Sequence, residues 1–200
     1  MTLPAHDLVV LAGGGGRRMG SADKAEVVIA GARLLDRVLA AVPGAGQRVA
    51  VGPVRPTQPA VRWCREHPSG GGPVAALAVA LPLVGAPYAV VLAVDLPLVD
   101  PAVVAMLLTA AVGRDGAIGV DPTGRDQPLL AAYGVTALRS ALAGDEPTAG
   151  ASMRSLLARL DLARVEVDDA ALDCDTWADV ARAQAVLSAR AGSNPPGGTG

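Results

Sequence analysis

Glycine and positive charge are concentrated near the start of the chain, in a stretch whose residue types suit phosphate binding. Residues 11–24 read Leu11-Ala-Gly-Gly-Gly-Gly-Arg-Arg-Met-Gly-Ser-Ala-Asp-Lys24, directly after a short apolar run. Glycine lets successive backbone N–H groups face a bulky anion, because no side chain stands between them. Arg17, Arg18 and Lys24 supply the positive charge that a polyphosphate needs. The stretch therefore predicts a phosphate-binding loop; the alternative is a flexible glycine turn with solvated arginines.

Two familiar glycine-loop signatures do not fit these residues. The dinucleotide fingerprint G-x-G-x-x-G fails, because its last glycine would fall on Arg18 or Met19. A P-loop needs Gly-Lys-Ser/Thr, and here Gly20 is followed directly by Ser21. The loop is thus a phosphate cradle of another kind.

A carboxylate follows the most strand-like run of the sequence. Residues 88–94 are uncharged and apolar, as expected for a central parallel strand covered on both faces. Asp95 comes next, at the edge of an open α/β sheet where ligands bind. Because Mg²⁺ is usually held by one or two carboxylates together with substrate phosphates, Asp95 is the best candidate for a metal ligand. A turn or N-cap aspartate is the alternative.

The elements that must position these residues alternate between strand and helix along most of the chain. The apolar spacing and the capping residues predict helices at 34–42, from Pro73 to 81, at 101–112, 135–142, 152–160 and 176–188. Strands are expected at 8–12, 47–51, 60–64, 88–94, 116–120, about 127–133 and 163–167. The alternation predicts a three-layer α/β/α fold with a doubly wound, mostly parallel sheet. We expect one domain at 1–190 and a disordered tail at 191–200.

Composition excludes several function classes. The net charge of −2, with no Phe and few other aromatic residues, argues against nucleic acid as a partner. No apolar stretch approaches the roughly 20 residues of a membrane span, and the start lacks the cationic region of a signal peptide, so we expect a cytoplasmic protein. Cys64 and Cys174 are far apart and only two histidines accompany them, which disfavours a zinc site or a cysteine nucleophile.

Five stretches in order resemble the motifs of the MobA-like nucleotidyltransferase family, and most closely those of the molybdenum cofactor guanylyltransferases. The first is an opening motif made of Leu11 to Gly14, Arg18-Met19-Gly20 and Asp23-Lys24. The other four are Gly72-Pro73, Asp95-Leu96-Pro97, Gln127-Pro128-Leu129, and Asp173-Cys174-Asp175-Thr176. The resemblance covers residues 8 to about 188. It implies transfer of GMP from Mg·GTP to the phosphate of molybdenum-bearing molybdopterin, with release of pyrophosphate.

The resemblance also implies roles for individual residues. It implies Arg18, Lys24 and Asp95 as catalytic residues and Asp95 as a Mg²⁺ ligand. Asp175 is a second candidate ligand, and a turn residue beside the helix cap at Thr176 is the alternative for it. Nucleotide contacts are implied for Leu11, Ala12, Gly13, Gly14, Gly15, Lys24, Gly71, Gly72, Pro73 and Asp95. An incoming phosphate is already a nucleophile, so such a reaction needs positioning and charge neutralisation rather than a general base. This agrees with a site built from glycines, cations and carboxylates.

Two alternatives stay open at this point. Gly13 resembles the guanylyl type, whereas Asp173 and Asp175 resemble cytidylyl relatives, so CTP, or a sugar or alcohol phosphate as acceptor, is the nearest rival. Glu26 and Glu66 depart from the pattern and leave room for a non-catalytic nucleotide-binding accessory protein. A molybdoenzyme or another protein of the cofactor pathway is a possible partner.

Overall fold

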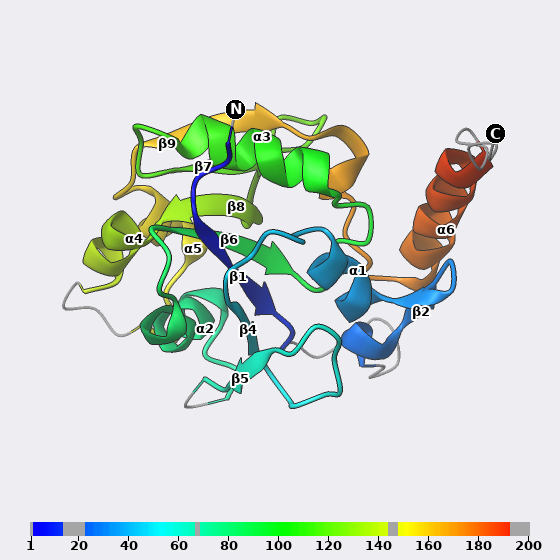
Figure 1. Ribbon diagram of the computed structural model, residues 1–200, viewed down its shortest axis with the longest axis horizontal. Coiled ribbons are helices and arrows are strands. Elements are labelled where there is room, and N and C mark those ends of the chain that lie inside the picture. Colours follow the sequence, from blue (N-terminus) through cyan, green and yellow to red (C-terminus); the bar gives the residue numbers. More distant parts are fainter. Residues whose placement is uncertain (1, 14–22, 67–68, 144–147, 193–200) are drawn as a thin grey trace.

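The computed structural model describes residues 2–13, 23–66, 69–143 and 148–192, and a single seven-stranded sheet forms its centre. Figure 1 shows the sheet between helices, in the order β5-β4-β1-β6-β8-β7-β9. The strands are β1 (His6–Leu11), β4 (Arg48–Val51), β5 (Arg62–Cys64), β6 (Tyr88–Ala93), β7 (Gly116–Val120), β8 (Asp126–Gly134) and β9 (Leu162–Glu166). All pairings are parallel except those of β8, so the sheet is mostly parallel as predicted.

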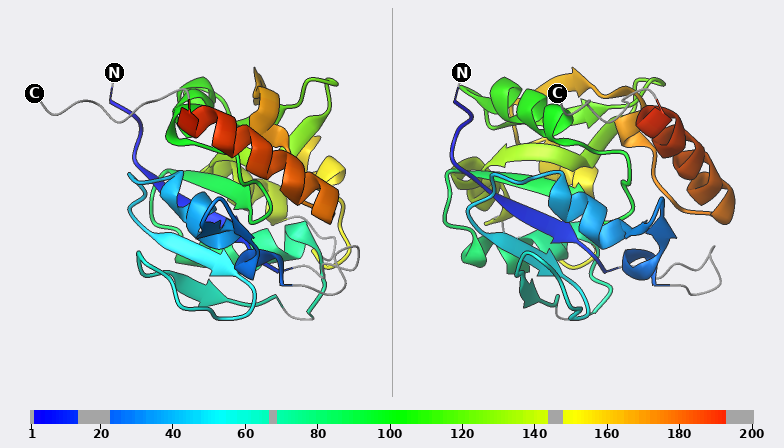
Figure 2. Two further views of the ribbon diagram at one scale, coloured as in Figure 1. Left: turned by 90° about the vertical axis from the view of Figure 1, so that its right-hand side faces the viewer. Right: turned by 45° about the vertical axis from the view of Figure 1, so that its right-hand side comes forward.

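Helices cover both faces of the sheet and make the three predicted layers. They are α1 (Leu34–Ala40), α2 (Pro73–Ala80), α3 (Pro101–Ala111), α4 (Val135–Leu142) and α5 (Met153–Leu157), with short 3-10 turns η3 (Leu81–Leu83) and η4 (Asp168–Ala171). Apolar side chains of α1 and α3 belong to one core cluster, and those of α2, α4 and α5 belong to another. Figure 2 shows the same arrangement after turns of 90° and 45° about the vertical axis.

The central strands contribute side chains to both apolar clusters, because successive residues of a strand point to opposite faces of the sheet. In β1, Leu8 and Val10 belong to the core under α1 and α3, whereas Val9 and Leu11 belong to the core under α2. All four side chains are buried, as expected for a parallel strand covered on both sides. The uncharged sequence of these four positions is therefore a direct result of their place in the sheet.

The order of the strands reverses at β1, and this reversal prepares a binding site. The chain goes from β1 through α1 to β4 on one side, and returns from β5 through α2 to β6 on the other side. After β1 the chain enters α1 on one face of the sheet, whereas α2, which leads into β6, covers the other face. A crevice is expected at such a switch point.

A third, smaller apolar cluster joins α6 (Trp177–Gly192) to the body of the molecule. Figure 1 shows α6 beside the hairpin of β2 (Val28–Ile29) and β3 (Ala32–Arg33), apart from the three layers. Ile29 and Ala183 are fully buried in this cluster. The sequence did not lead us to expect this hairpin, since each strand has only two residues.

Most predicted elements are present with shifted ends. Asp100 caps α3 by accepting hydrogen bonds from Ala102 N and Val103 N, as its place before Pro101 predicts. Helix α5 ends earlier than expected, at Leu157, and α6 continues to Gly192. The predicted tail lies outside the described residues from 193 onward. Among the described helices, none is both long and apolar enough to cross a membrane.

Candidate active site

A cavity of about 720 Å³ opens at the carboxyl edge of the sheet, at the switch point beside β1. Its floor is the end of three neighbouring parallel strands, namely Leu11 to Gly13 after β1, Val51 to Pro53 after β4, and Ala93 to Leu96 after β6. The glycine loop before α2 (residues 69–72) and the start of α2 also line the cavity, as do Asp23 and Lys24. The start of β8 and Asp173 complete the cavity. Its volume suits a ligand of nucleotide size.

The floor needs a glycine at one position. Gly52 has φ +147°, and a Cβ there would lie 2.9 Å from the backbone C and O of Ala12. The end of β4 thus approaches the end of β1 so closely that no side chain fits between them. At Gly13, by contrast, a Cβ would meet Val51 O at 3.6 Å, an ordinary contact. The fold therefore requires glycine at Gly52 but not at Gly13.

Lys24 lies at the charged centre of the site. Its Nζ is 2.7 Å from Asp95 Oδ2 and 2.5 Å from Asp175 Oδ1, and its side chain is only 15% exposed. It is the only lysine in the chain. Asp95 lies two residues beyond the end of β6, and Asp175 comes from the C-terminal segment, where Cys174 N donates a hydrogen bond to Asp95 O (2.9 Å). Residues 71 and 151 positions apart therefore meet at one ammonium group.

The electrostatics of the site favour a cation between the carboxylates. Burial by itself would lower the pKa of Lys24, but hydrogen bonds to Asp175 and Asp95, together with their charges, outweigh it and raise the pKa. Burial raises the pKa of Asp173, and the charges of Asp175 and Asp95 raise it further, while Lys24 opposes them. The region is thus rich in negative charge, and the ammonium group of Lys24 contacts two of its three carboxylates.

Asp95 and Asp175 are the residues that could hold a divalent metal. Both contact the same positive charge, which demonstrates that a cation fits between them, and carboxylate oxygens are the ligands that Mg²⁺ prefers. Over the described residues, no group of three or more His, Cys, Asp or Glu side chains forms a complete metal cage. A metal at this point would need further oxygen ligands from a substrate or from water.

The glycine loop before α2 brings a carboxylate to the cavity. Glu66 Oε1 accepts a hydrogen bond from Gly70 N at 2.9 Å, whereas its Oε2 is buried and finds no hydrogen-bond partner among the described residues. Gly72 has φ +88° and precedes Pro73, which opens α2 as the sequence predicted. A buried acceptor without a partner at a cavity wall indicates a place for a ligand donor.

The structure brings most of the predicted site residues together. Lining the cavity are Leu11, Ala12, Gly13, Lys24, Gly72, Pro73 and Asp95. Gly71 is not among the lining residues, and its carbonyl oxygen accepts a hydrogen bond from Gly150 N at 2.8 Å. Asp175 joins the site through Lys24. The predicted residues Gly14, Gly15 and Arg18 lie outside the described residues.

Sequence reasoning missed the cavity residues that no motif singles out. Gly52 and Pro53 follow a short strand, and Arg65 and Ser69 flank the glycine loop, but none has a distinctive spacing. The glycine directly after the strand of 47–51 was the available signal, because it lies at the same sheet edge as the end of β1. Of the two cysteines, Cys174 is fully buried and Cys64 is half-buried.

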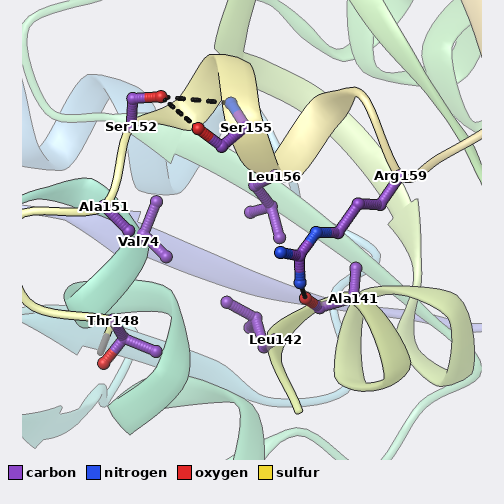
Figure 3. Close-up of a pocket in the computed structure, with 9 residues that line it drawn as sticks. All are labelled: Val74, Ala141, Leu142, Thr148, Ala151, Ser152, Ser155, Leu156 and Arg159. Carbon is purple, nitrogen blue, oxygen red and sulfur yellow. Dashed lines mark hydrogen bonds between the residues drawn. The ribbon is translucent and has the colours of Figure 1, made fainter. Parts of the chain in front are cut away.

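A second pocket, of about 30 Å³, lies between α2, α4 and α5 (Figure 3). Arg159 there donates to the carbonyl oxygen of Ala141 at 3.2 Å, and Ser152 contacts Ser155. The pocket has room for little more than a water molecule, so it does not compete with the large cavity as a nucleotide site.

Comparisons with known proteins agree with this geometry. Residues 8–165 match the family model of the MobA-like NTP transferase domain. A probable molybdenum cofactor guanylyltransferase of Natronomonas pharaonis is 31% identical over 169 residues, covering 80% of this chain and 83% of that protein. The crystal structure of molybdopterin-guanine dinucleotide biosynthesis protein A from Archaeoglobus fulgidus is similar with a TM-score of 0.71 and 26% identity, covering 92% and 99% of the two chains.

The fold is shared more widely. A 2-C-methyl-D-erythritol 4-phosphate cytidylyltransferase from Thermus thermophilus is similar with a TM-score of 0.69 and 22% identity, covering 90% of this chain and 98% of that one. The same architecture thus occurs in proteins named for different nucleotides and acceptors, so the architecture alone does not select the substrate.

Proposed function

Because the chain belongs to the MobA-like NTP transferase family and is a nucleotidyltransferase, we propose that it transfers GMP from Mg·GTP to the phosphate of molybdenum-bearing molybdopterin. The observation that carries the proposal is Lys24 held between Asp95 and Asp175 at the wall of a nucleotide-sized cavity. The names of the Natronomonas and Archaeoglobus relatives support the choice of base and acceptor.

The triphosphate binds where the glycines and Lys24 meet. Gly13 offers backbone atoms to the phosphates at the end of β1, and Lys24 offers a compact charge that a phosphate oxygen can share. Arg18, which lies outside the described residues, supplies further charge in this proposal. In this proposal, which follows the family resemblance, the loop of Gly71 and Gly72 contacts the base and the ribose.

Glu66 supports a base as the ligand at this wall. Its buried Oε2 needs a donor, which guanine supplies from N1–H and N2–H₂ and cytosine supplies from N4–H₂. The choice of guanine over cytosine therefore rests on the names of the relatives and on Gly13. Gly13 lies on the cavity floor without being needed by the fold, which is consistent with a role toward the ligand.

Mg²⁺ fits Asp95 and Asp175. When bound, the ion neutralises charge that develops on the phosphates. Asp95 and Asp175 would hold the ion, Lys24 would orient the triphosphate, and no side chain has to remove a proton from the acceptor. An oxygen of the acceptor phosphate forms a bond to the α-phosphorus, and the bond from that phosphorus to the bridging oxygen of the leaving group breaks. Pyrophosphate leaves with the electron pair.

The test is pyrophosphate release with each of the four common nucleoside triphosphates, Mg²⁺ and the molybdenum-bearing pterin. We expect turnover with GTP and formation of the guanine dinucleotide. Asp95→Asn should lower the rate at least about a hundredfold, because it removes charge from the reacting end of the cavity. Asp161→Asn, at a carboxylate that is 67% exposed, is the matched control and should have no effect.

Other outcomes decide against parts of the proposal. Turnover with CTP alone would contradict the choice of base, and turnover with a sugar phosphate alone would contradict the acceptor. Binding of GTP without turnover under all conditions would favour an accessory protein.

We also propose a cytoplasmic location, which the two free thiols suit.

A further inference from the structure

We propose that Arg55 is a positioning residue for nucleotidyl transfer, which fixes Lys24 in the site by holding the carboxylate of Asp23. Arg55 does not line the cavity, whereas Asp23 and Lys24 do. The inference rests on the proposed function, since Lys24 is there a phosphate-binding residue. It concerns how this chain holds that lysine in place.

Arg55 is a buried charge with a partner on each side. Its side chain is 8% exposed, and its Nε and Nη2 donate to Asp23 Oδ2 and Oδ1 at 2.8 and 2.7 Å. Its Nη1 donates to Pro53 O at 2.8 Å, and the guanidinium lies 5.7 Å from the ring centroid of Trp63. This two-pronged geometry is one that arginine makes and lysine does not.

A charge buried in this way calls for an explanation beyond stability. Only the arginine of this ion pair is buried, since the Asp23 side chain is 45% exposed, and ion pairs in contact with solvent contribute little to stability, so stability alone does not account for Arg55. What the fork and the aromatic ring do provide is a fixed place for the carboxylate of Asp23. The Arg55–Asp23 pair therefore fixes the position of the Asp23 carboxylate.

Asp23 passes this constraint to Lys24. Its Oδ1 also accepts a hydrogen bond from Ala25 N at 3.1 Å and so caps the 3-10 turn η2 (Lys24–Glu26). Lys24 is the first residue of that turn, and its flexible side chain must be ordered to meet Asp95 and Asp175. Because Arg55 and Asp23 fix this turn, Lys24 loses less conformational freedom when the triphosphate binds.

Arg55 has a second effect on the cavity. Asp23 lines the cavity beside Lys24, where a triphosphate is proposed to bind, and its negative charge would repel that ligand. Arg55 neutralises this carboxylate from the protein side. Loss of Arg55 should therefore weaken triphosphate binding as well as misplace Lys24.

Two variants of Arg55 and a matched control test the proposal. Arg55→Gln should lower kcat/KM for the triphosphate about tenfold or more, since misplaced catalytic groups cost that much, and Arg55→Lys should fall between it and the wild type. Arg62→Gln is the control: Arg62 is exposed on β5 and contacts Gln47 Oε1 at 3.2 Å, so its loss should change the rate less than about twofold.

A double-mutant cycle separates positioning from a merely structural role. If Arg55 positions Lys24, Arg55→Gln should cost little further kcat, measured at saturating triphosphate so that the effect of the Asp23 charge on binding is removed, once Lys24→Met is present. An equal fold-loss in both backgrounds would overturn the proposal.

A second measurement needs no turnover. Lys24 is the only lysine, so selective isotope labelling of lysine gives one side-chain NMR signal. Arg55→Gln should move this signal toward that of a free lysine, and Arg62→Gln should leave it unchanged. An unchanged signal in folded Arg55→Gln would overturn the proposal, even if the wild type transfers no GMP and the proposed function itself fails. If Arg55→Gln does not fold, Asp23→Asn breaks the same link at a half-exposed carboxylate.

Discussion

At the scale of single residues, the ammonium group of Lys24 and its two carboxylates form a coupled unit. The contacts raise the pKa of Lys24 in the folded state above the value of 10.5 expected for the unfolded chain. A base whose pKa is raised by folding contributes stability below the unfolded pKa, and this contribution is lost as the pH rises through the folded pKa. The free energy of unfolding should therefore contain a term that disappears in strongly alkaline solution.

The comparison of wild type with Lys24→Met measures this term. In urea unfolding without metal, the wild type should lose more stability than Lys24→Met as the pH rises above 10.5, because the pKa of Lys24 is raised in the folded state. No other lysine titrates there, and the tyrosines and cysteines are common to both proteins. Parallel pH profiles would show that the carboxylates do not hold Lys24 in solution.

At the scale of elements, the junction of β1 and β4 decides the shape of the cavity floor. Gly52→Ala should lower the free energy of unfolding by about 2 kcal/mol, because its Cβ meets the Ala12 backbone at 2.9 Å in a left-handed conformation. Nucleotide affinity should fall with it, since both strand ends must shift. Urea unfolding and thermal stabilisation by GTP measure the two effects.

Gly13→Ala is the matched control for this junction. It adds the same methyl group at the same cavity floor, but the new contact of 3.6 Å is ordinary, so stability should change by less than about 0.5 kcal/mol. Any effect of Gly13→Ala should therefore appear in nucleotide preference. Equal destabilisation by the two substitutions would contradict the tight approach of β4 to β1.

At the scale of the whole molecule, the two ends of the sheet have different roles. Asp7 is buried at the end of β1 that lies away from the cavity, where its carboxylate accepts hydrogen bonds from Gln47 N at 2.7 Å, Gly85 N at 2.7 Å and Ala86 N at 3.0 Å. It thus joins the segments that enter β1, β4 and β6. This end holds the fold together, and the carboxyl end carries the site.

Asp7→Ala should separate stability from function. It leaves three backbone donors without their acceptor, and should cost about 3 kcal/mol in urea unfolding. At a temperature where the variant is folded, its KM for the triphosphate should equal that of the wild type. A raised KM would mean that the two ends of the sheet are coupled.

The sequence by itself determined the parts of this protein that depend on local pattern. The uncharged run of β6, the cap of Asp100 and the capping box of Thr176 and Asp179 each follow from neighbours within a few residues, and all are present. The alternation of strand and helix predicted the layered sheet. The ordered motifs indicated the family, and placed Lys24 and Asp95 together as candidates.

Only the tertiary structure decided which distant residues meet. Asp175 reaches Lys24 because the C-terminal segment returns to the end of β6, and Arg55 reaches Asp23 because the loop after β4 folds behind η2. Neither contact has a sequence spacing that predicts it, since sheet order sets such distances and one-dimensional patterns do not contain sheet order. The requirement for glycine at Gly52 has the same origin, because it arises where β4 closes against β1.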